Sequence, residues 1–425
     1  KCCGMNGAML MYVRRGPWSL LVLLLASLLA PRTASAQLIE GLESYSDAVV
    51  GLSTTRWAGP RVPAPERAER PPATQQLDSR WWPLRVYAGP RTSPSRLRAT
   101  LHAAESSFEA LFLAGFLTSF GDGDGARDLY LVDQLEPASA GIDALGNFSG
   151  LDGARAFATV DVRLPGSHLA SCVARALLEA QLLELDPAEN AALRRGVAAY
   201  FAWLSTGQSC EDEPRARPEQ NPFATVASAQ AWLERLSARQ DRNRGTFLFD
   251  MWQFARQRTW EGADLRGSPD LLEAIAKALA IAHDDFELVA GELAEGLWNE
   301  APARTLSFAA LPAFPDKRAP PLEVLGSAQL RIHLGEPRPG TRLRAWSRAE
   351  GGRYTLSALR MDALGAPLSR LELPARTNGQ LSIELDARTF AVAITLTRVA
   401  DLGLPDPDAP SPEPRSAGLI VDVAP

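Results

Sequence analysis

Hydrophobic residues recur at helical spacing through the middle of the chain. Between residues 95 and 118 apolar positions lie mostly three or four apart, at Leu97, Leu101, Ala104, Phe108, Leu111, Phe112 and Gly115. This spacing predicts an α-helix with one apolar face. A second apolar stripe predicts a helix over 167–185, which the Asp186-Pro187 pair ends. The same pattern predicts further helices over 188–204, 224–240, 244–258, 269–281 and 284–298.

After Pro302 apolar and polar residues alternate instead. The alternating runs are separated by Gly and Pro turns and lie at 328–334, 342–346, 354–361, 381–385, 390–397 and 419–423. A period of two predicts strands, and short strands about ten residues apart are typical of an antiparallel β-sandwich. Shorter apolar runs predict strands earlier in the chain, at 81–86, 129–132 and 159–162. We therefore expect an α+β protein whose mainly helical part, with a small sheet, is followed by a β-sandwich.

The start of the chain has the pattern of a signal peptide. Arg14 and Arg15 precede an apolar run over 20–30, and Ala34-Ser35-Ala36 matches the small-x-small cleavage motif. A retained membrane anchor is the alternative, but the run is shorter than the ~20 residues that a spanning helix needs. We expect cleavage after Ala36, a secreted or periplasmic mature protein, and no membrane span once the leader is removed.

Composition divides the rest of the chain into three parts. Residues 37–80 are rich in Pro and Arg and predict an extended or mobile lead-in. Residues 81–302 form the predicted helical domain and residues 303–425 the predicted sandwich. Because the leader 1–36 holds four basic residues and no acid, its removal takes the formal charge from −6 to −10. An acidic surface disfavours nucleic acid and anionic lipid as partners. The excess of Arg over Lys, with abundant Ala, Leu and Pro, is typical of a GC-rich bacterial gene.

Two cysteines, Cys172 and Cys210, remain in the mature chain. In an oxidising compartment they pair most simply as one disulfide. It would close a loop of about 38 residues and contribute about 3–4 kcal/mol. A catalytic thiol is the alternative, and it needs a positioned histidine. The four histidines stand in no recognisable Cys/His or zinc-binding spacing: His102, His168, His283 and His333.

Other candidate sites are weaker. Asp122, Asp124 and Asp128 cluster as calcium ligands do, although the bidentate Glu of a full EF-hand loop is missing and a turn explains the segment as well. Glu105 and Glu109 share one helix face, as paired acid/base carboxylates or a solvated face would. The sequence has no G-x-S-x-G elbow, P-loop or dinucleotide fingerprint. These absences disfavour the common hydrolase and nucleotide-binding classes.

The segment 172–204 reads CVARALLEAQLLELDPAENAALRRGVAAYFAWL. It resembles the active-site helix pair of the gluzincin-type zinc metallopeptidases, in particular of the members that bacteria secrete. In that family the first helix reads V-A-H-E-x-x-H-A, and the second reads W-x-x-E-G-x-A-x-Y and supplies the third zinc ligand through its Glu. The likeness extends weakly over about 90–425, through the DLYLV strand, the helix at 244–260 and the β-rich C-terminal part.

The residues on which the family's chemistry depends are replaced. Arg175 and Glu179 stand at the two His positions, Ala176 at the general-base Glu, and Arg195 at the Glu ligand. A guanidinium does not lose its proton to bind a metal, and a catalytic zinc needs three protein ligands. The resemblance therefore implies a degenerate member with no zinc, no other cofactor and no peptidase activity. We predict an ion cluster of Arg175, Glu179 and Arg195 in place of the metal.

These observations predict an exported, non-catalytic metallopeptidase-like protein that acts as a binding or scaffold module for a protein or peptide ligand. Two alternatives remain. One is a secreted hydrolase or peptidase with an unorthodox site built from acids such as Asp122, Asp124 and Asp128. The other is a structural protein of the cell envelope.

Overall fold

A computed structural model of the chain describes its helices, strands and most of the loops that join them. The described residues are 61–62, 66–113, 125–148, 151–210, 215–255, 265–266, 270–282, 284–298, 304–313, 321–349, 351–373, 379–400, 413–415 and 417–424. All of them belong to one compact unit, Thr55–Pro425. The predicted leader, 1–36, lies outside the described residues. The unit contains helices and mixed sheets, so the α+β class is confirmed at that level.

The first sheet contains five strands in the order β2-β3-β4-β6-β5. Their bounds are Gln75–Asp78 for β2, Leu84–Ala88 for β3, Arg127–Val132 for β4, Leu151–Asp161 for β6 and Ala138–Phe148 for β5. The three inner strands run parallel, and the two outer strands pair antiparallel to them. A parallel strand in the middle of a sheet is covered on both faces, and β4 is accordingly buried from Arg127 to Leu131. The predicted strand at 129–132 is the C-terminal part of β4, and the one at 159–162 overlaps the end of β6, whereas β5 was not predicted.

The predicted lead-in, 37–80, which we expected to be extended or mobile, contains a β-strand near its C-terminal end. Gln75–Asp78 pairs residue by residue with β3, with Leu77 opposite Val86. The proline-rich composition did not predict this strand, because Gln75–Asp78 is a strand through its hydrogen bonds with the edge of the sheet. The hydroxyl of Ser79 then accepts hydrogen bonds from the backbone of Trp81 and Trp82. The resulting turn delays β3 until after Pro83, later than the predicted start at residue 81.

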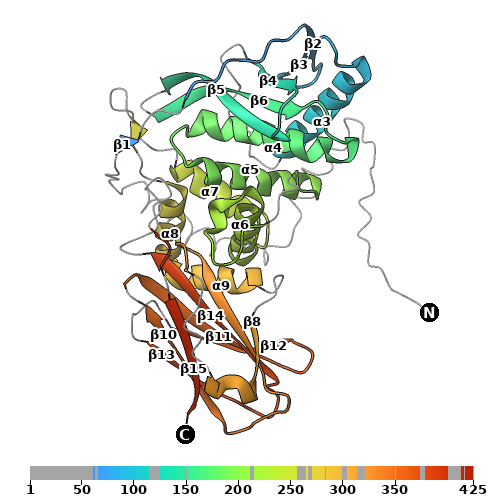
Figure 1. Ribbon diagram of the computed structural model, residues 1–425. Coiled ribbons are helices and arrows are strands. Elements are labelled where there is room, and N and C mark those ends of the chain that lie inside the picture. The colour runs from blue at the N-terminus through green and yellow to red at the C-terminus, as the bar shows by residue number, and fades with distance from the viewer. Residues whose placement is uncertain are drawn as a thin grey trace, which may run out of the picture. The chain divides into compact units, whose positions relative to one another are not determined.

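Helices α3 (Pro94–Leu113) and α4 (Gly166–Leu185) pack against this sheet. Helix α3 contacts β3 and α4, and α4 contacts β5 and β6. On its other side α4 contacts α5 (Ala191–Thr206), and Figure 1 shows α4 between the sheet and α5. Because α4 is covered from both sides, every residue from Ser171 to Leu185 is buried. The many alanines of α4 allow this close approach without large side chains on both faces.

The following helices begin at polar caps that the sequence supplies. The Asn190 side chain accepts hydrogen bonds from the backbone at the start of α5, and Thr225 does so for α6 (Val226–Asp241). Asp270 and Glu273 form a capping box at α8 (Leu271–Ile281). Such caps satisfy backbone N–H groups that have no partner within the helix. The bounds of the other two helices are Thr246–Ala255 for α7 and Phe286–Trp298 for α9.

The C-terminal strands form two further sheets. One has the order β12-β11-β14-β9-β8 and the other β13-β10-β15. Their bounds are Arg304–Ser307 for β8, Ser327–His333 for β9, Arg342–Ala349 for β10, Arg353–Met361 for β11, Pro367–Leu373 for β12, Gln380–Glu384 for β13, Ala391–Ala400 for β14 and Ala417–Ala424 for β15. Both sheets contribute to one hydrophobic core, with Leu343 and Ile383 from the smaller sheet and Leu356 and Ile394 from the larger. Strands β8 and β12 were not predicted, because neither has a clear alternation.

Helix α9 lies against the second face of the larger sheet, where it contacts β14 and β11. A side chain at Gly291 would meet Thr355 Oγ1 at 2.7 Å, so the absence of a Cβ allows the helix to approach this closely. Glu295 of α9 accepts a hydrogen bond from Ser357 at 2.9 Å and pairs with Arg370 at 3.1 Å. Strand β14 is buried at every position because the hydrophobic core covers one face and α9 the other.

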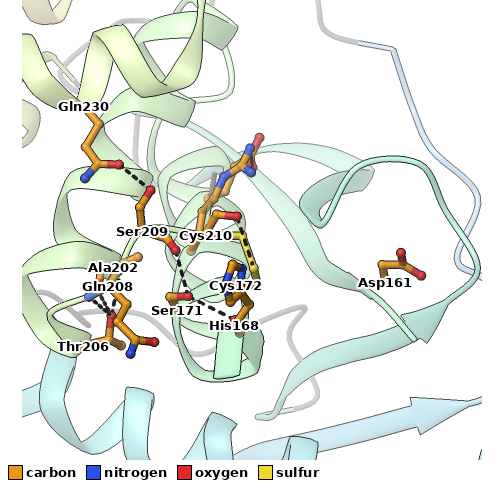
Figure 2. The surroundings of a disulfide bond; sticks show 12 residues. Asp161, His168, Ser171, Cys172, Ala202, Thr206, Gln208, Ser209, Cys210 and Gln230 are labelled. Carbon is orange, nitrogen blue, oxygen red and sulfur yellow. Dashed lines mark hydrogen bonds and ion pairs between the residues drawn. A yellow bond between two sulfur atoms is a disulfide. The ribbon is translucent and has the colours of Figure 1, made fainter. Parts of the chain in front are cut away.

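The predicted disulfide between Cys172 and Cys210 is confirmed. It joins the first turns of α4 to the segment just after α5 (Figure 2). The hydroxyl of Ser171 donates to the carbonyl oxygens of His168 and Ser209, at 3.0 and 3.3 Å, beside the sulfur atoms. Since the start of α4 meets the end of α5, the two helices run antiparallel.

Helix α5 packs closely against α6 at Gly196. A Cβ built on Gly196 would lie 2.5 Å from the Cβ of Ala229, far inside van der Waals contact. Glycine costs about 1 kcal/mol relative to alanine in a helix interior. The close approach of the two helices is therefore the physical reason for glycine at this position.

We expect Gly196→Ala to lower the free energy of unfolding, although helix propensity alone predicts a gain of about 1 kcal/mol. The added methyl group forces α5 and α6 apart, and overpacking of this kind costs about 1–3 kcal/mol. Urea unfolding followed by circular dichroism measures the change. Gly166→Ala is the matched control, because a Cβ there meets nothing within 4 Å. A stabilised Gly196→Ala protein would contradict the packing that we describe.

Candidate functional site

The candidate site lies where α4 and α5 face each other. The short connection from Asp186 to Asn190 reverses the chain, and the disulfide holds the far ends of the helices together. This arrangement brings three of the predicted site residues, Arg175 and Glu179 of α4 and Arg195 of α5, into one cluster. They come from positions one helical turn apart on α4 and from the facing surface of α5.

Glu179 is the centre of the cluster. Its side chain is 1% exposed, and its two carboxylate oxygens face different guanidinium groups. Arg175 Nη2 lies 3.7 Å from Glu179 Oε2, and Arg195 Nε lies 3.3 Å from Glu179 Oε1. Removing a carboxylate from water is costly unless opposite charges and hydrogen bonds compensate. The two arginines provide that compensation from two different helices.

The fourth predicted position, Ala176, is buried and lies beside the cluster in the sequence of α4. Its methyl side chain cannot accept or donate a proton. Within the described parts of the chain, no three His, Cys, Asp or Glu side chains gather in a way that could hold a metal ion. The cluster can therefore fix the positions of two helices relative to each other.

Two further members of the cluster were missed by sequence reasoning. Glu136, in the turn before β5, lies 3.6 Å from Arg195 Nη2 and extends the cluster to the surface. Arg194 donates to the backbone carbonyl of Glu189 at 2.9 Å. Burial lowers the pKa of the Arg194 guanidinium, and the negative charge of Glu179 offsets part of that effect. Neither residue stands at a diagnostic spacing, so only the tertiary structure identifies them.

The loop between α4 and α5 is tied to α8 by a buried carboxylate. Glu189 is 3% exposed, and its Oε2 accepts a hydrogen bond from the backbone N–H of Leu271 at 2.8 Å. Its Oε1 accepts from the backbone of Asn190 at 2.8 Å. An anion is stabilised at the N-terminus of a helix, where backbone N–H groups lack partners within the helix. This carboxylate therefore holds the connection between α4 and α5 against the N-terminus of α8.

A chain of buried hydroxyl groups links α5 to α6 and α7. Tyr200 Oη donates to Ser237 Oγ at 2.6 Å, and Ser237 Oγ donates to Asp241 Oδ1 at 2.7 Å. Asp241 Oδ2 accepts from the backbone N–H of Phe247 at the start of α7. Burial raises the pKa of the Tyr200 hydroxyl to about 12, and the hydrogen bond to Ser237 offsets part of the rise. Tyr200 is thus a structural link between three helices.

The calcium prediction rests on residues that the structure describes only in part. Asp122 and Asp124 lie outside the described residues. Asp128 is 3% exposed, and its carboxylate pairs with the guanidinium of Arg70. An arginine side chain thus binds the one described member of the predicted site, and calcium binding there stays a prediction.

The remaining candidates are separated in space or engaged elsewhere. Glu105 accepts a hydrogen bond from Ser79 at 2.6 Å, which supports the turn before β3. His102 and His333 are exposed, His168 stands beside the disulfide (Figure 2), and His283 lies outside the described residues. Glu109 is exposed on α3.

Comparisons with known proteins identify no family for the chain. No protein-family model and no curated protein sequence matches it. A solved structure, the enzymatically active domain of bacteriophage CBA120 tailspike protein 4, is similar over 24% of this chain and 14% of the phage chain, with 12% identity and a TM-score of 0.16. A similarity of this size carries no argument about fold or function.

We expect Glu179→Gln to lower the free energy of unfolding by about 3–5 kcal/mol, because it removes the negative charge between two guanidiniums, one of them buried. Chemical denaturation of the purified variant measures the loss. Glu136→Gln is the matched control, since it removes a carboxylate from the exposed end of the same cluster, where a salt bridge contributes about 0–1 kcal/mol. Equal small losses in both variants would show that the buried cluster has no structural role.

We expect the free energy of unfolding to fall as the pH rises from about 10 to about 12. The pKa of Tyr200 is raised in the folded protein, so the folded state keeps a proton that the unfolded state loses above pH ~10. Its contribution is complete below pH ~10 and disappears as the pH approaches the folded value. Tyr200→Phe should remove this part of the alkaline dependence, measured by urea unfolding at a series of pH values, whereas Tyr87→Phe should retain it. An unchanged dependence in Tyr200→Phe would contradict the assignment.

Proposed function

We propose that this chain is a degenerate relative of the gluzincin-type metallopeptidases, exported as a non-catalytic binding or scaffold protein. The observation that carries the proposal is the ion cluster at the family's metal-binding positions. Glu179, at one of these positions, is the buried centre of an ion cluster with Arg175 and Arg195, which stand at two others. These two guanidiniums and one carboxylate therefore determine whether the site can bind a metal ion.

A zinc ion would have to compete with this cluster on unfavourable terms. Catalytic zinc is bound by three protein ligands and keeps one position open for water. The guanidinium groups of Arg175 and Arg195 stay protonated and repel a cation, and the carboxylate of Glu179 is already paired with both. Ala176 provides no general base. The residues present do not fit a catalytic zinc site, so we derive no hydrolytic step from them.

Support for the zincin-like arrangement comes from the order and contacts of the elements. A small mixed sheet precedes the helix with the degenerate motif, and α4 packs between that sheet and the antiparallel helix α5. Two sheets with a common hydrophobic core follow the helices, in agreement with the proposed β-sandwich. These features suit the resemblance on which the proposal rests, and the boundary near residue 303 would fall between α9 and β8.

The proposed role is the recognition of a protein or peptide outside the cytoplasm. It rests on the predicted leader, on a lone cysteine pair that forms a disulfide, and on the acidic composition, which disfavours nucleic acid. Among the described helices, none combines the length and the apolar character of a membrane span. A structural role in the envelope and a hydrolase with an unorthodox site are the competing functions.

The decisive experiment rebuilds the metal site. The four substitutions Arg175→His, Ala176→Glu, Glu179→His and Arg195→Glu restore the family's ligands and base. We expect the folded variant to bind stoichiometric zinc, measured by metal analysis after dialysis, because three ligands then converge from α4 and α5. The unmodified mature protein should bind none and should not cleave a mixture of peptides.

The matched control carries the three α4 substitutions and keeps Arg195. With two ligands and a nearby guanidinium, it should bind zinc far more weakly than the complete variant. A complete variant that is folded by circular dichroism but binds no zinc would refute the zincin-like frame. Stoichiometric zinc with peptide turnover in the unmodified protein would refute the loss of the site.

A further inference from the structure

The sheet of β2 to β6 has a second face, opposite α4. Arg127 of β4 pairs with Glu184 of α4 at 3.0 Å, so this residue marks the helix-covered face. Side chains alternate between the two faces along a strand. Leu129 therefore shares the helix-covered face with Arg127, whereas Asp128 and Tyr130 lie on the opposite face. Tyr87 stacks on Tyr130 with ring centroids 4.8 Å apart, and Phe157 meets Tyr130 edge-on at 5.6 Å. This outer face is thus an aromatic layer with a carboxylate in it.

Residues 66–73, here called the strap, cross this outer face before the chain enters β2 (Figure 1). The backbone N–H of Ala68 donates to the carbonyl oxygen of Ile142 on the edge strand β5, at 2.7 Å. A Cβ at Gly141 would lie 3.0 Å from the Cβ of Ala68 and 2.7 Å from the ring of Phe157, so glycine leaves room for the strap. Six of the strap's eight residues are nevertheless exposed.

Arg70 connects the strap to the sheet through its guanidinium group. Nη1 pairs with the carboxylate of Asp128 and lies 3.5 Å from the hydroxyl of Tyr130. Nε pairs with Asp143 at 2.5 Å, and the guanidinium carbon lies 5.6 Å from the centre of the Phe157 ring. Two carboxylates, a hydroxyl and an aromatic ring therefore surround one planar cation, as charge-assisted bonds and cation–π contact require.

The strands place these groups by an irregularity in β5. The pairing of β5 with β6 shifts register between Ile142 and Ala144, so Asp143 is the extra residue of a bulge. Bulges redirect a side chain relative to the regular alternation of a strand. Asp143 is aimed at the same guanidinium as Asp128, which comes from the sheet centre. The site is thus assembled from three strands before any part of the strap is added.

The electrostatics of the site favour a bound cation. Burial by itself lowers the pKa of the Arg70 guanidinium, but the hydrogen bonds to Asp143 and Tyr130 and the charges of Asp143 and Asp128 raise it above the ordinary value. Asp128 is 3% exposed in the presence of Arg70. A buried carboxylate is strongly destabilising without a positive partner. A cationic group therefore has to pair with Asp128 whenever this face is shielded from water.

We propose that this outer face is an exchangeable arginine-binding site, in which the strap is the resident ligand and an extended, arginine-bearing segment of a partner protein can replace it. The resident ligand itself defines the chemistry: an extended segment that crosses the edge strand and inserts one guanidinium. Pro71 and Pro72 directly after Arg70 restrict the strap to extended conformations and donate no backbone hydrogen bonds. The exposed residues of the strap make its exchange feasible without disturbing the core. This inference does not depend on the loss of the zinc site.

The first experiment tests the site by chemical rescue in the full-length mature protein. Arg70→Ala should lower the melting temperature, and millimolar n-propylguanidinium should restore part of it while leaving the unmodified protein unchanged. n-Propylammonium, with the same charge and tail but no planar fork, should restore less. Arg344→Ala is the matched control, because Arg344 also binds a carboxylate, Asp422, with two nitrogens at 2.9 and 2.8 Å, but at a more exposed position.

The second experiment tests exchange with a peptide. A fluorescent peptide of residues 64–73 should bind Arg70→Ala at least tenfold more tightly than the unmodified protein, whose own strap competes at a high effective concentration. The same peptide with lysine in place of Arg70 should bind more weakly. Adding Asp128→Asn to Arg70→Ala should abolish both peptide binding and guanidinium rescue.

Absence of both rescue and peptide binding in folded Arg70→Ala would overturn the proposal. If Arg70→Ala does not fold, Arg70→Lys takes its place, since lysine keeps the charge but loses the planar fork that reaches both Asp128 and Asp143. If the unmodified protein forms dimers that disappear in either variant, the occupant of the site is a second copy of this chain. That result would contradict the proposal that a different partner protein binds there.

Discussion

A carboxylate buried between two helices can stay charged only if the helices supply positive partners, and Glu179 meets this constraint through Arg175 and Arg195. Arg195 is partly exposed, but Glu179 and Arg175 are shielded from water. The attraction across the cluster is therefore strong, and the cost of breaking it is high. It fixes the rotation of α4 relative to α5. The disulfide at the far ends of the same two helices fixes their separation and direction. The sheet, the remaining helices and the proposed loss of catalysis all depend on this helix pair.

The same solution to the problem of buried charge recurs in this protein. Arg127 and Glu184 pair at 3.0 Å between β4 and α4. Arg398, which is fully buried, donates to the backbone carbonyl of Leu322 at 2.7 Å. The planar guanidinium presents five N–H donors in a rigid fork, whereas lysine presents three on one flexible ammonium. The high arginine content therefore has structural consequences, because this residue joins strand β4 to helix α4 and strand β14 to the segment at Leu322.

Functionally, the molecule offers two kinds of surface. The cluster of Arg175, Glu179 and Arg195 stabilises the helix pair, and Glu136 and Arg195 are its exposed end. The outer face of the first sheet has instead a site that accepts a guanidinium from a mostly exposed segment. Under the proposed function, the helices and the sheet are a rigid frame, and the proposed binding site lies at the sheet's outer face and edge.

Much of the architecture could be predicted from the sequence, because it depends on local periodicity. The stripe of Leu169, Val173 and Ala180 predicted α4 to within a residue, and the alternating run around Ile394 predicted the most buried strand of the C-terminal sheets. The disulfide between Cys172 and Cys210 was also predicted from the sequence. We predicted the cluster of Arg175, Glu179 and Arg195 because their spacing in the sequence matches that of the family's metal-binding motif.

Only the tertiary structure decided which distant groups meet. The strand β2 follows a proline-rich segment and is a strand because β3 offers it hydrogen bonds. Glu136 joins the cluster and Arg70 reaches Asp128 across the sheet, although nothing near either residue in the sequence indicates it. Local patterns determine elements, whereas the pairing of buried charges depends on distances that exist only after the elements have packed.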